Sequence, residues 1–555
     1  MAVKAFFESI LGFEIEGVSI AYDLADEVEF IEDRIQKAVE QADVHLGVYP
    51  TELSDLRESF GESQDGYVLD SLAGSSAAFV VFSREEDREF CVRRFAEIRR
   101  QVNQSDFKAE EESDEESQAL LGGSRPSRGR PPGRSSSSLS SAMLFRGKFP
   151  ITVAEAPDPC DILWRNYQVQ GGLKMSRVVL TLICGLLMVF VLAAVIFAPS
   201  VLSGLSYMDI PSPSLAQVRL KWLEQLAVAG LTFLGNRLLA LSMRSAADAG
   251  GFAHRVSEDG IFVVCTYLLV VANSVAPLLV AQFVAANEDL QVTTAMTTEW
   301  IFWLIVVINI PTELLYILYP AWTYWSGHFF VRQSRHITVR EGQPVLTSLE
   351  FPLAQRYVDT LLTTTLVFIM IFVDGQSMYT LSAEILLFFY SLYIYFIDKY
   401  FFLRICRQTY YTSETLDVTV HYLYFIPMCV LLLIPVQQLD SYLRGWMKFT
   451  TLAVGVLLYL LVVRLCQACN KPRRELTDVP YVEVASMVPC NYFNTNHAHV
   501  LRTLHFPSIV VPPIYPHLPG KEYLHGGQFA DYDDSVRPAL STPKVEGGVP
   551  RLGGS

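Results

Sequence analysis

Between Val178 and Phe197 the chain has no charged residue, and nearly every side chain is apolar. About 20 apolar residues in a helix are enough to cross the hydrocarbon core of a bilayer. Inside that core each backbone N–H and C=O needs a partner within its own segment, which a helix supplies and a loop does not. The run therefore predicts a transmembrane helix.

Further apolar runs follow, so we predict an α-helical polytopic membrane protein with about eight spans. The composition agrees, because 51% of the residues are hydrophobic and only 18% are charged. The predicted transmembrane region is 171–467, with spans at 178–197, 222–243, 261–284, 300–319, 357–373, 379–397, 422–436 and 449–463. The seventh run is short and contains Pro427 and Pro435, so a re-entrant segment is the alternative there.

Lys and Arg residues between the runs predict the orientation, because cytosolic loops are enriched in them. Basic residues precede the first span and follow the last: Arg165, Lys174 and Arg177, then Lys471, Arg473 and Arg474. Two predicted external loops also hold basic residues and are exceptions to the rule. We expect a multi-pass protein of the plasma membrane or an endomembrane, with both terminal parts in the cytosol.

Residues 1–170 are predicted to form a cytosolic α+β domain with a disordered insert at 101–145. Phe13–Asp23 and Ala77–Phe82 have the patterns of strands, and Ala25–Asp43 and Glu85–Arg100 those of amphipathic helices. The insert is either a passive linker or a loop regulated by phosphorylation. Residues 468–555 form a predicted cytosolic tail with no clear periodicity.

Several classes of function are excluded by composition and motifs. The net charge of -15 argues against nucleic acid as a partner. No phosphate-binding loop, metalloprotease, hydrolase or dinucleotide motif is present, so neither an enzyme nor a cofactor is expected. Cys466 and Cys469 resemble one half of a metal site, but a second cysteine pair is missing. Free thiols or palmitoylation are the simpler interpretations, and no metal is expected.

The strongest candidate for a functional residue is Glu313, deep in the fourth predicted span. A charge there costs about 2.5–3.5 kcal/mol on insertion scales, so an ionisable residue inside a span is a functional candidate by default. Asn309 and Tyr316 share its helical face, and Pro311 bends the backbone beside it. These residues predict the polar wall of a cation path, with a structural hydrogen bond between helices as the alternative.

Other polar residues in the spans are weaker candidates. Arg237, beside Asn236 in the second span, either pairs with Glu313, lines the path or extends to the cytosolic surface. Asn273 and Ser274 in the third span either face a cavity or hold helices together.

Charged residues near two predicted span boundaries are expected to pair locally. Arg356 and Asp359 lie one helical turn apart, and Asp398 and Lys399 are adjacent. Such pairs would lower the cost of placing these charges near the membrane.

Several residue groups together resemble the OSCA family of hyperosmolality-gated, calcium-permeable stress-gated cation channels. Residues Ala154–Asn166, with the pattern AP-P-DI-W-N, resemble the segment that leads from the family's cytosolic domain into its first pore-side helix. Three further matches occur in the family's order: Ala78–Phe82 with its AFVxF strand, Glu313–Pro320 with its gating helix, and Tyr395–Tyr400 with its DKY segment.

The resemblance implies a TMC/scramblase-like channel fold, an RRM-like cytosolic domain and opening under membrane tension or osmotic stress. Membrane lipids and permeant cations, calcium among them, are the implied partners, and a homodimer is a further expectation. The chain departs from the family in lacking three helices ahead of the cytosolic domain, which points to a truncated or partial protein. Its gating helix lacks the family's glycines, with Pro311 in their place, and Asp374–Ser377 replaces a more apolar connection.

Three functions follow as hypotheses: a mechanically or osmotically gated cation channel, a phospholipid scramblase on the same fold, or a truncated non-conducting membrane protein. The sequence does not distinguish the stimulus, the permeant ion or the oligomeric state.

Overall fold

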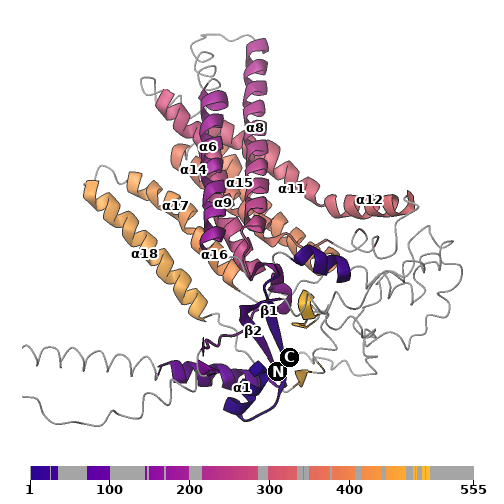
Figure 1. Cartoon of the computed structure of the whole chain (residues 1–555). Coiled ribbons are helices and arrows are strands. Elements are labelled where there is room, and N and C mark those ends of the chain that lie inside the picture. Colours follow the sequence, from indigo (N-terminus) through magenta and orange to yellow (C-terminus); the bar gives the residue numbers. More distant parts are fainter. Residues whose placement is uncertain are drawn as a thin grey trace, which may run out of the picture.

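Long helices dominate the computed structural model and stand side by side as a bundle, with a small N-terminal α/β region at one end (Figure 1). Most of the predicted insert and of the tail lies outside the residues that the structure describes. The described residues are 2–24, 27–35, 72–100, 144–146, 149–167, 171–198, 215–284, 298–333, 342, 345, 349–374, 378–406, 414–438, 445–469, 479–481, 483, 491–493 and 495–499.

Seven helices in the described residues are long and apolar enough to cross a membrane. They account for every predicted span except the fourth. The helices are α6 (Gly171–Leu192) with η4 (Ala193–Phe197), α8 (Leu215–Ala249), α9 (Arg255–Val284), α14 (Leu353–Asp374), α15 (Met378–Tyr400) with η6 (Phe401–Ile405), α16 (Thr415–Leu423) with α17 (Phe425–Gln438), and α18 (Gly445–Cys469).

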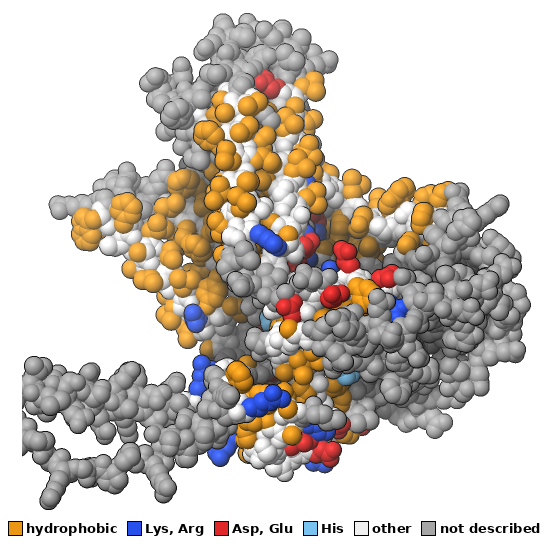
Figure 2. Space-filling view, viewed as in Figure 1, with side chains coloured by type: hydrophobic (Ala, Val, Ile, Leu, Met, Phe, Trp, Pro, Cys, Tyr) orange, Lys and Arg blue, Asp and Glu red, His pale blue; other side chains and the backbone are white. Residues whose placement is uncertain are grey.

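Burial divides these helices into a centre and a periphery. In the candidate spans of α9 and α14, 56% of the residues are buried, against 11% in α6 and 6% in α18. The peripheral helices carry exposed apolar rows, such as Leu180 and Leu187 on α6 and Leu457 and Leu461 on α18. Figure 2 shows apolar side chains covering the upright helices. Apolar surfaces of this extent suit the hydrocarbon of a bilayer.

The predicted fourth span, 300–319, is not one continuous helix, which corrects the sequence prediction. Residues 298–303 are helical and lead into the π-helix η5 (Leu304–Asn309), then α11 (Ile310–Tyr316), a turn at residues 317–318, and α12 (Tyr319–Gln333). The Ile310 N–H reaches back five residues to the Ile305 carbonyl. Pro311 has no N–H and its ring crowds the carbonyl four residues earlier, which explains a widened turn directly before it.

The predicted seventh span also differs from one simple helix. It begins earlier than predicted, at Thr415, and a turn at Tyr424 divides it into α16 and α17. Pro427 cannot donate to the carbonyl of Leu423, and the break falls at that bond. The combined stretch Thr415–Leu433 is long enough to span the membrane. The apolar run 422–436, whose shortness raised the alternative of a re-entrant segment, is therefore only part of the helical stretch.

The N-terminal region contains α1 (Ala2–Leu11) and the antiparallel strands β1 (Ile15–Tyr22) and β2 (Gly74–Phe82), in which Val18 pairs with Val80. Residues 28–35 and 85–100 are helical, and β3 (Leu144–Phe145) pairs with β4 (Phe149–Pro150). Both predicted strands and the second predicted helix are confirmed. The first predicted helix is confirmed at 28–35, and its remainder lies outside the described residues.

The 154–166 segment joins this region to the bundle through two short helices, η2 (Pro159–Asp161) and η3 (Trp164–Asn166). An oxygen of Asp161 accepts the N–H of Val256 at 2.8 Å, and the Asn166 amide donates to the Phe252 carbonyl at 2.9 Å. Trp164 is 4% exposed. The segment therefore attaches the N-terminal region to the turn between α8 and α9.

Part of the C-terminal tail packs on the same region. The Asn496 amide donates to the Ile20 carbonyl at 2.8 Å and to the Ser19 hydroxyl at 2.9 Å. The ring of Tyr492 stacks on Phe79 with 5.3 Å between centroids. These contacts place residues 491–493 and 495–499 against strand β1 and its neighbours, a position that the tail's sequence does not predict.

Candidate functional site

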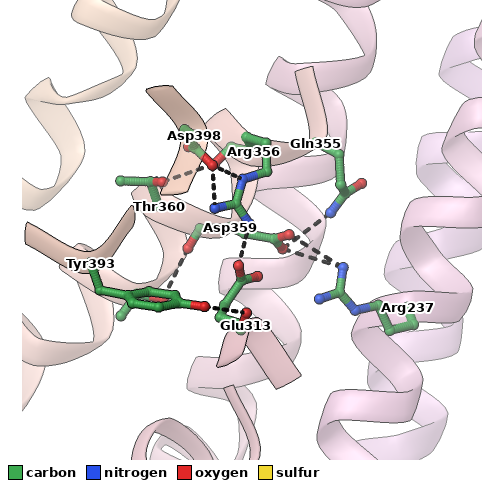
Figure 3. Close-up of polar contacts among 9 residues, drawn as sticks. Arg237, Glu313, Gln355, Arg356, Asp359, Thr360, Tyr393 and Asp398 are labelled. Atoms are coloured by element: carbon green, nitrogen blue, oxygen red, sulfur yellow. Dashed lines mark hydrogen bonds and ion pairs between the residues drawn. The ribbon is translucent and has the colours of Figure 1, made fainter. Parts of the chain in front are cut away.

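Glu313 lies on α11 and forms an ion pair with Arg356 of α14 inside the bundle (Figure 3). The two residues are only 6% and 5% exposed, so the pair is shielded from solvent on nearly all sides. Arg356 also donates to Asp398 of α15, through Nη2 at 2.7 Å and Nε at 3.0 Å. One guanidinium group thus holds two carboxylates from two other helices.

A second ion pair lies beside the first. Arg237 of α8 contacts Asp359 of α14 at 3.3 Å, and the Gln355 amide donates to Asp359 at 3.1 Å. Together with Glu313, Arg356 and Asp398 these two charges form what we call the charge cluster. Three carboxylates face two guanidinium groups, so the fully ionised cluster has one excess negative charge.

The local pairs predicted from sequence were wrong. Arg356 pairs with Glu313 and Asp398, and Asp359 pairs with Arg237, so neither forms the predicted one-turn contact. Arg237 likewise does not pair with Glu313. The long arginine side chains reach acids on other helices. Each buried acid needs such a partner, because an unpaired charge inside the bundle is costly.

Asp398 also fails to pair with its neighbour Lys399. Adjacent residues of a helix point in different directions, so they rarely contact each other. Asp398 points inward to Arg356, while the ammonium of Lys399 lies over the Tyr395 ring, 5.6 Å from its centroid.

A small cavity adjoins the charge cluster where α8, η5, α11 and α14 meet. Its volume is about 20 Å³, which is enough for a water molecule. Its polar lining includes Asn236, Arg237, Asn309, Glu313, Asp359 and Thr363. Asn309 and Glu313 therefore share one face, as their spacing predicts, and that face borders the cavity.

Asn236, Asn273 and Ser274 form a hydrogen-bonded group between α8 and α9. The Asn273 amide donates to the Asn236 oxygen at 2.8 Å, and the Asn236 amide donates to the Ser274 hydroxyl at 3.1 Å. Asn273 and Ser274 are fully buried, and no described group donates to the Asn273 side-chain oxygen. The contacts join the two helices, while Asn236 also borders the cavity.

The remaining two predicted site residues lie at the edges of this arrangement. The guanidinium of Arg356 lies over the Tyr316 ring, 5.0 Å from its centroid, so Tyr316 touches the charge cluster. Pro311 occupies the first turn of α11, directly after the π-helix. Its position matches the predicted bend.

Sequence reasoning missed Arg356 as the partner of Glu313, and Asp398 as the second acid that Arg356 binds. It also missed Tyr393, whose hydroxyl donates to the Glu313 carbonyl at 3.4 Å. An available signal was the excess of acids over bases inside the predicted spans, since each buried charge needs a partner from somewhere in the bundle. Among the described residues, no three potential ligands gather as a metal site.

No protein-family model matches the chain, and no curated protein matches it. The class of protein therefore rests on the seven candidate spans and the fold around them. The chain is a polytopic α-helical membrane protein with a small N-terminal α/β region.

Proposed function

We propose that the protein is a mechanically or osmotically gated, calcium-permeable cation channel whose path runs beside Glu313. The observation that carries the proposal is the charge cluster with its excess carboxylate, whose buried Glu313–Arg356 pair lies beside a cavity between the helices. A net negative charge in surroundings of low dielectric attracts cations and repels anions. The stimulus and calcium permeation come from the resemblance of residues 154–166 and 313–320 to the OSCA family.

The described arrangement corresponds to a closed state in this proposal. Arg356 occupies the carboxylate that a passing cation would need, and the cavity holds little more than one water molecule. Opening requires Glu313 and Arg356, on α11 and α14, to separate. Tension would favour that state if it has a larger area in the membrane plane.

The placement of the polar residues favours a channel over a scramblase. A scramblase needs a hydrophilic furrow open to lipid, whereas Glu313, Asn236 and Asn273 are all buried. The described faces of the peripheral helices are lined by exposed apolar side chains. A non-conducting protein is the other alternative, and it predicts no current under any stimulus.

Contacts at the end of the bundle next to the N-terminal α/β region support an even number of membrane crossings. The Asp161–Val256 bond places the start of α9 beside the N-terminal region, and Arg255 contacts Glu350, just before α14, at 2.5 Å. α9 and α14 therefore start on the same side, and the chain between them must return across the membrane. Residues 298–316 are the apolar stretch available for that crossing.

We accordingly assign the broken helix of η5 and α11 as one further crossing. It is the fourth along the chain and brings the proposed total to eight. The contact of Asn496 with Ile20 keeps both terminal parts on one side, as an even number requires. Basic residues on that side make it cytosolic in our proposal. Membrane lipids and permeant cations are the proposed partners, together with a homodimeric assembly and an RRM-like fold for the N-terminal region.

Patch recording on liposomes that contain the purified full chain tests the channel proposal. Suction should evoke cation currents, and Glu313→Gln should lower cation selectivity or shift the tension threshold while surface expression in cells is unchanged. Glu384→Gln is the matched control, because this acid is exposed on α15. Currents of Glu313→Gln that equal wild type in both properties would refute the role of Glu313, and lipid flip-flop without current would favour the scramblase.

A further inference from the structure

Helix α12 carries an unusual concentration of exposed aromatic side chains. Its sequence, YPAWTYWSGHFFVRQ, covers Tyr319–Gln333. Of its aromatic residues, Trp322, Tyr324 and Trp325 are 62%, 63% and 57% exposed, and Tyr319, Phe329 and Phe330 are exposed as well. Large aromatic groups are rarely left in water, so this helix requires a partner or a nonaqueous environment.

Three of the exposed rings, Trp322, Trp325 and Phe329, form a stripe opposite the face that α12 uses for packing. Gly327 lies against the chain near Val345, whose carbonyl is 2.9 Å from where a Cβ would stand, and Val331 is fully buried. On the other face the Trp322 and Trp325 rings are 5.5 Å apart, and those of Trp325 and Phe329 are stacked at 5.6 Å. The stripe therefore remains uncovered although α12 is anchored on its opposite side.

The direction of α12 differs from that of the spanning helices. Figure 1 shows it extending away from the bundle, across the direction of α6 and α8, and Figure 2 shows apolar side chains along this arm. The turn at residues 317–318 connects it directly to α11. The first residue of α12 thus follows the end of the proposed crossing by η5 and α11, at the level where the chain leaves the hydrocarbon.

We infer that α12 lies in the plane of the membrane, with the Trp322–Trp325–Phe329 stripe in the headgroup region of the cytosolic leaflet. Trp and Tyr concentrate at this level of a membrane because their rings are amphipathic. In the sequence the stripe is followed by Arg332 and Arg335, and basic residues next to an interfacial helix are attracted to anionic lipids. The inference rests on the proposed crossing by η5 and α11 but does not require channel activity.

Tryptophan quenching by lipids brominated at defined acyl depths tests the inference in liposomes that contain the full chain. Comparing Trp325→Phe with the double variant Trp322→Phe/Trp325→Phe isolates the signal of Trp322. Adding Phe329→Trp to the double variant places a probe two turns further along the same face. Both probes should be quenched most by the shallowest bromines and should report equal depths.

A helix that crosses the membrane supplies the control. Leu458→Trp and Leu465→Trp, at exposed positions of α18 and in the same double variant, should differ in depth by about 10 Å. A similar difference between positions 322 and 329 would overturn the inference. So would quenching by aqueous iodide alone, or protection from both quenchers, which would indicate a covering protein surface. Because no current is measured, a failed channel proposal leaves this test intact.

Discussion

Replacing Arg356 by Gln should destabilise the bundle more than any other single change in the charge cluster. The substitution leaves Glu313 and Asp398 without a counter-charge, and Glu313 has a side chain only 7% exposed. Removing one partner of a buried ion pair costs about 3–5 kcal/mol, because the other charge stays desolvated. Glu313→Gln should cost less, about 1.5–3 kcal/mol for a lost charge-assisted hydrogen bond, since Arg356 keeps Asp398.

The cluster itself offers a control and a coupling test. Arg237→Gln should cost about 1 kcal/mol or less, because this side chain is 36% exposed and Asp359 keeps the hydrogen bond from Gln355. The double variant Arg356→Gln/Glu313→Gln should be more stable than Arg356→Gln alone, as the orphaned carboxylate is then absent.

Thermal denaturation in lipid nanodiscs, followed by a thiol-reactive dye, measures these differences through the protein's buried cysteines. The expected order of stability is wild type, then Arg237→Gln, Glu313→Gln and Arg356→Gln. Equal losses for Arg356→Gln and Arg237→Gln, or no recovery in the double variant, would refute the buried pairing.

Two further predictions concern other contacts. Burial lowers the pKa of His497, with Glu32 raising it and Arg165 lowering it further, so the neutral imidazole is favoured when the tail is packed. The contact of residues 491–493 and 495–499 should therefore be strongest above about pH 6.5 and weaken as the pH falls below it. The protection of the β1 amides, measured as their exchange rate relative to the intrinsic rate at each pH, should fall in acid. Protection that is independent of pH, or unchanged pH dependence in His497→Gln, would contradict this. Gly185→Val should lower the free energy of unfolding by about 1–3 kcal/mol, because a Cβ there would stand 2.9 Å from Leu269, whereas Gly230→Val, with no atom within 4 Å of such a Cβ, should be nearly neutral in the same denaturation assay.

The elements that the sequence predicted well depend on local patterns. Apolar runs of membrane length and the alternation in Phe13–Asp23 are properties of consecutive residues, and the structure confirms seven spans and the strand β1 there. The break of the fourth run was only partly foreseen. Pro311 indicated a bend, but the π-helical turn and the change of direction after Tyr316 depend on packing around the helix.

The partners in the site could not be predicted from local patterns. Arg356 and Glu313 are 43 residues apart, and Ser19 and Asn496 are 477 apart. Spacing along a helix identifies which residues share a face, as it did for Asn309 and Glu313, but not which helix that face meets. The assignment of charged partners therefore requires the tertiary arrangement.

The reversal potential of the suction-evoked current tests the central claim most directly, because it reports which ions the excess carboxylate admits. In liposomes with a KCl gradient, the wild-type current should reverse close to the potassium equilibrium potential. Glu313→Gln should move the reversal toward zero. Absence of any tension-evoked current from correctly folded protein, or a current that does not discriminate cations from anions, would contradict the account.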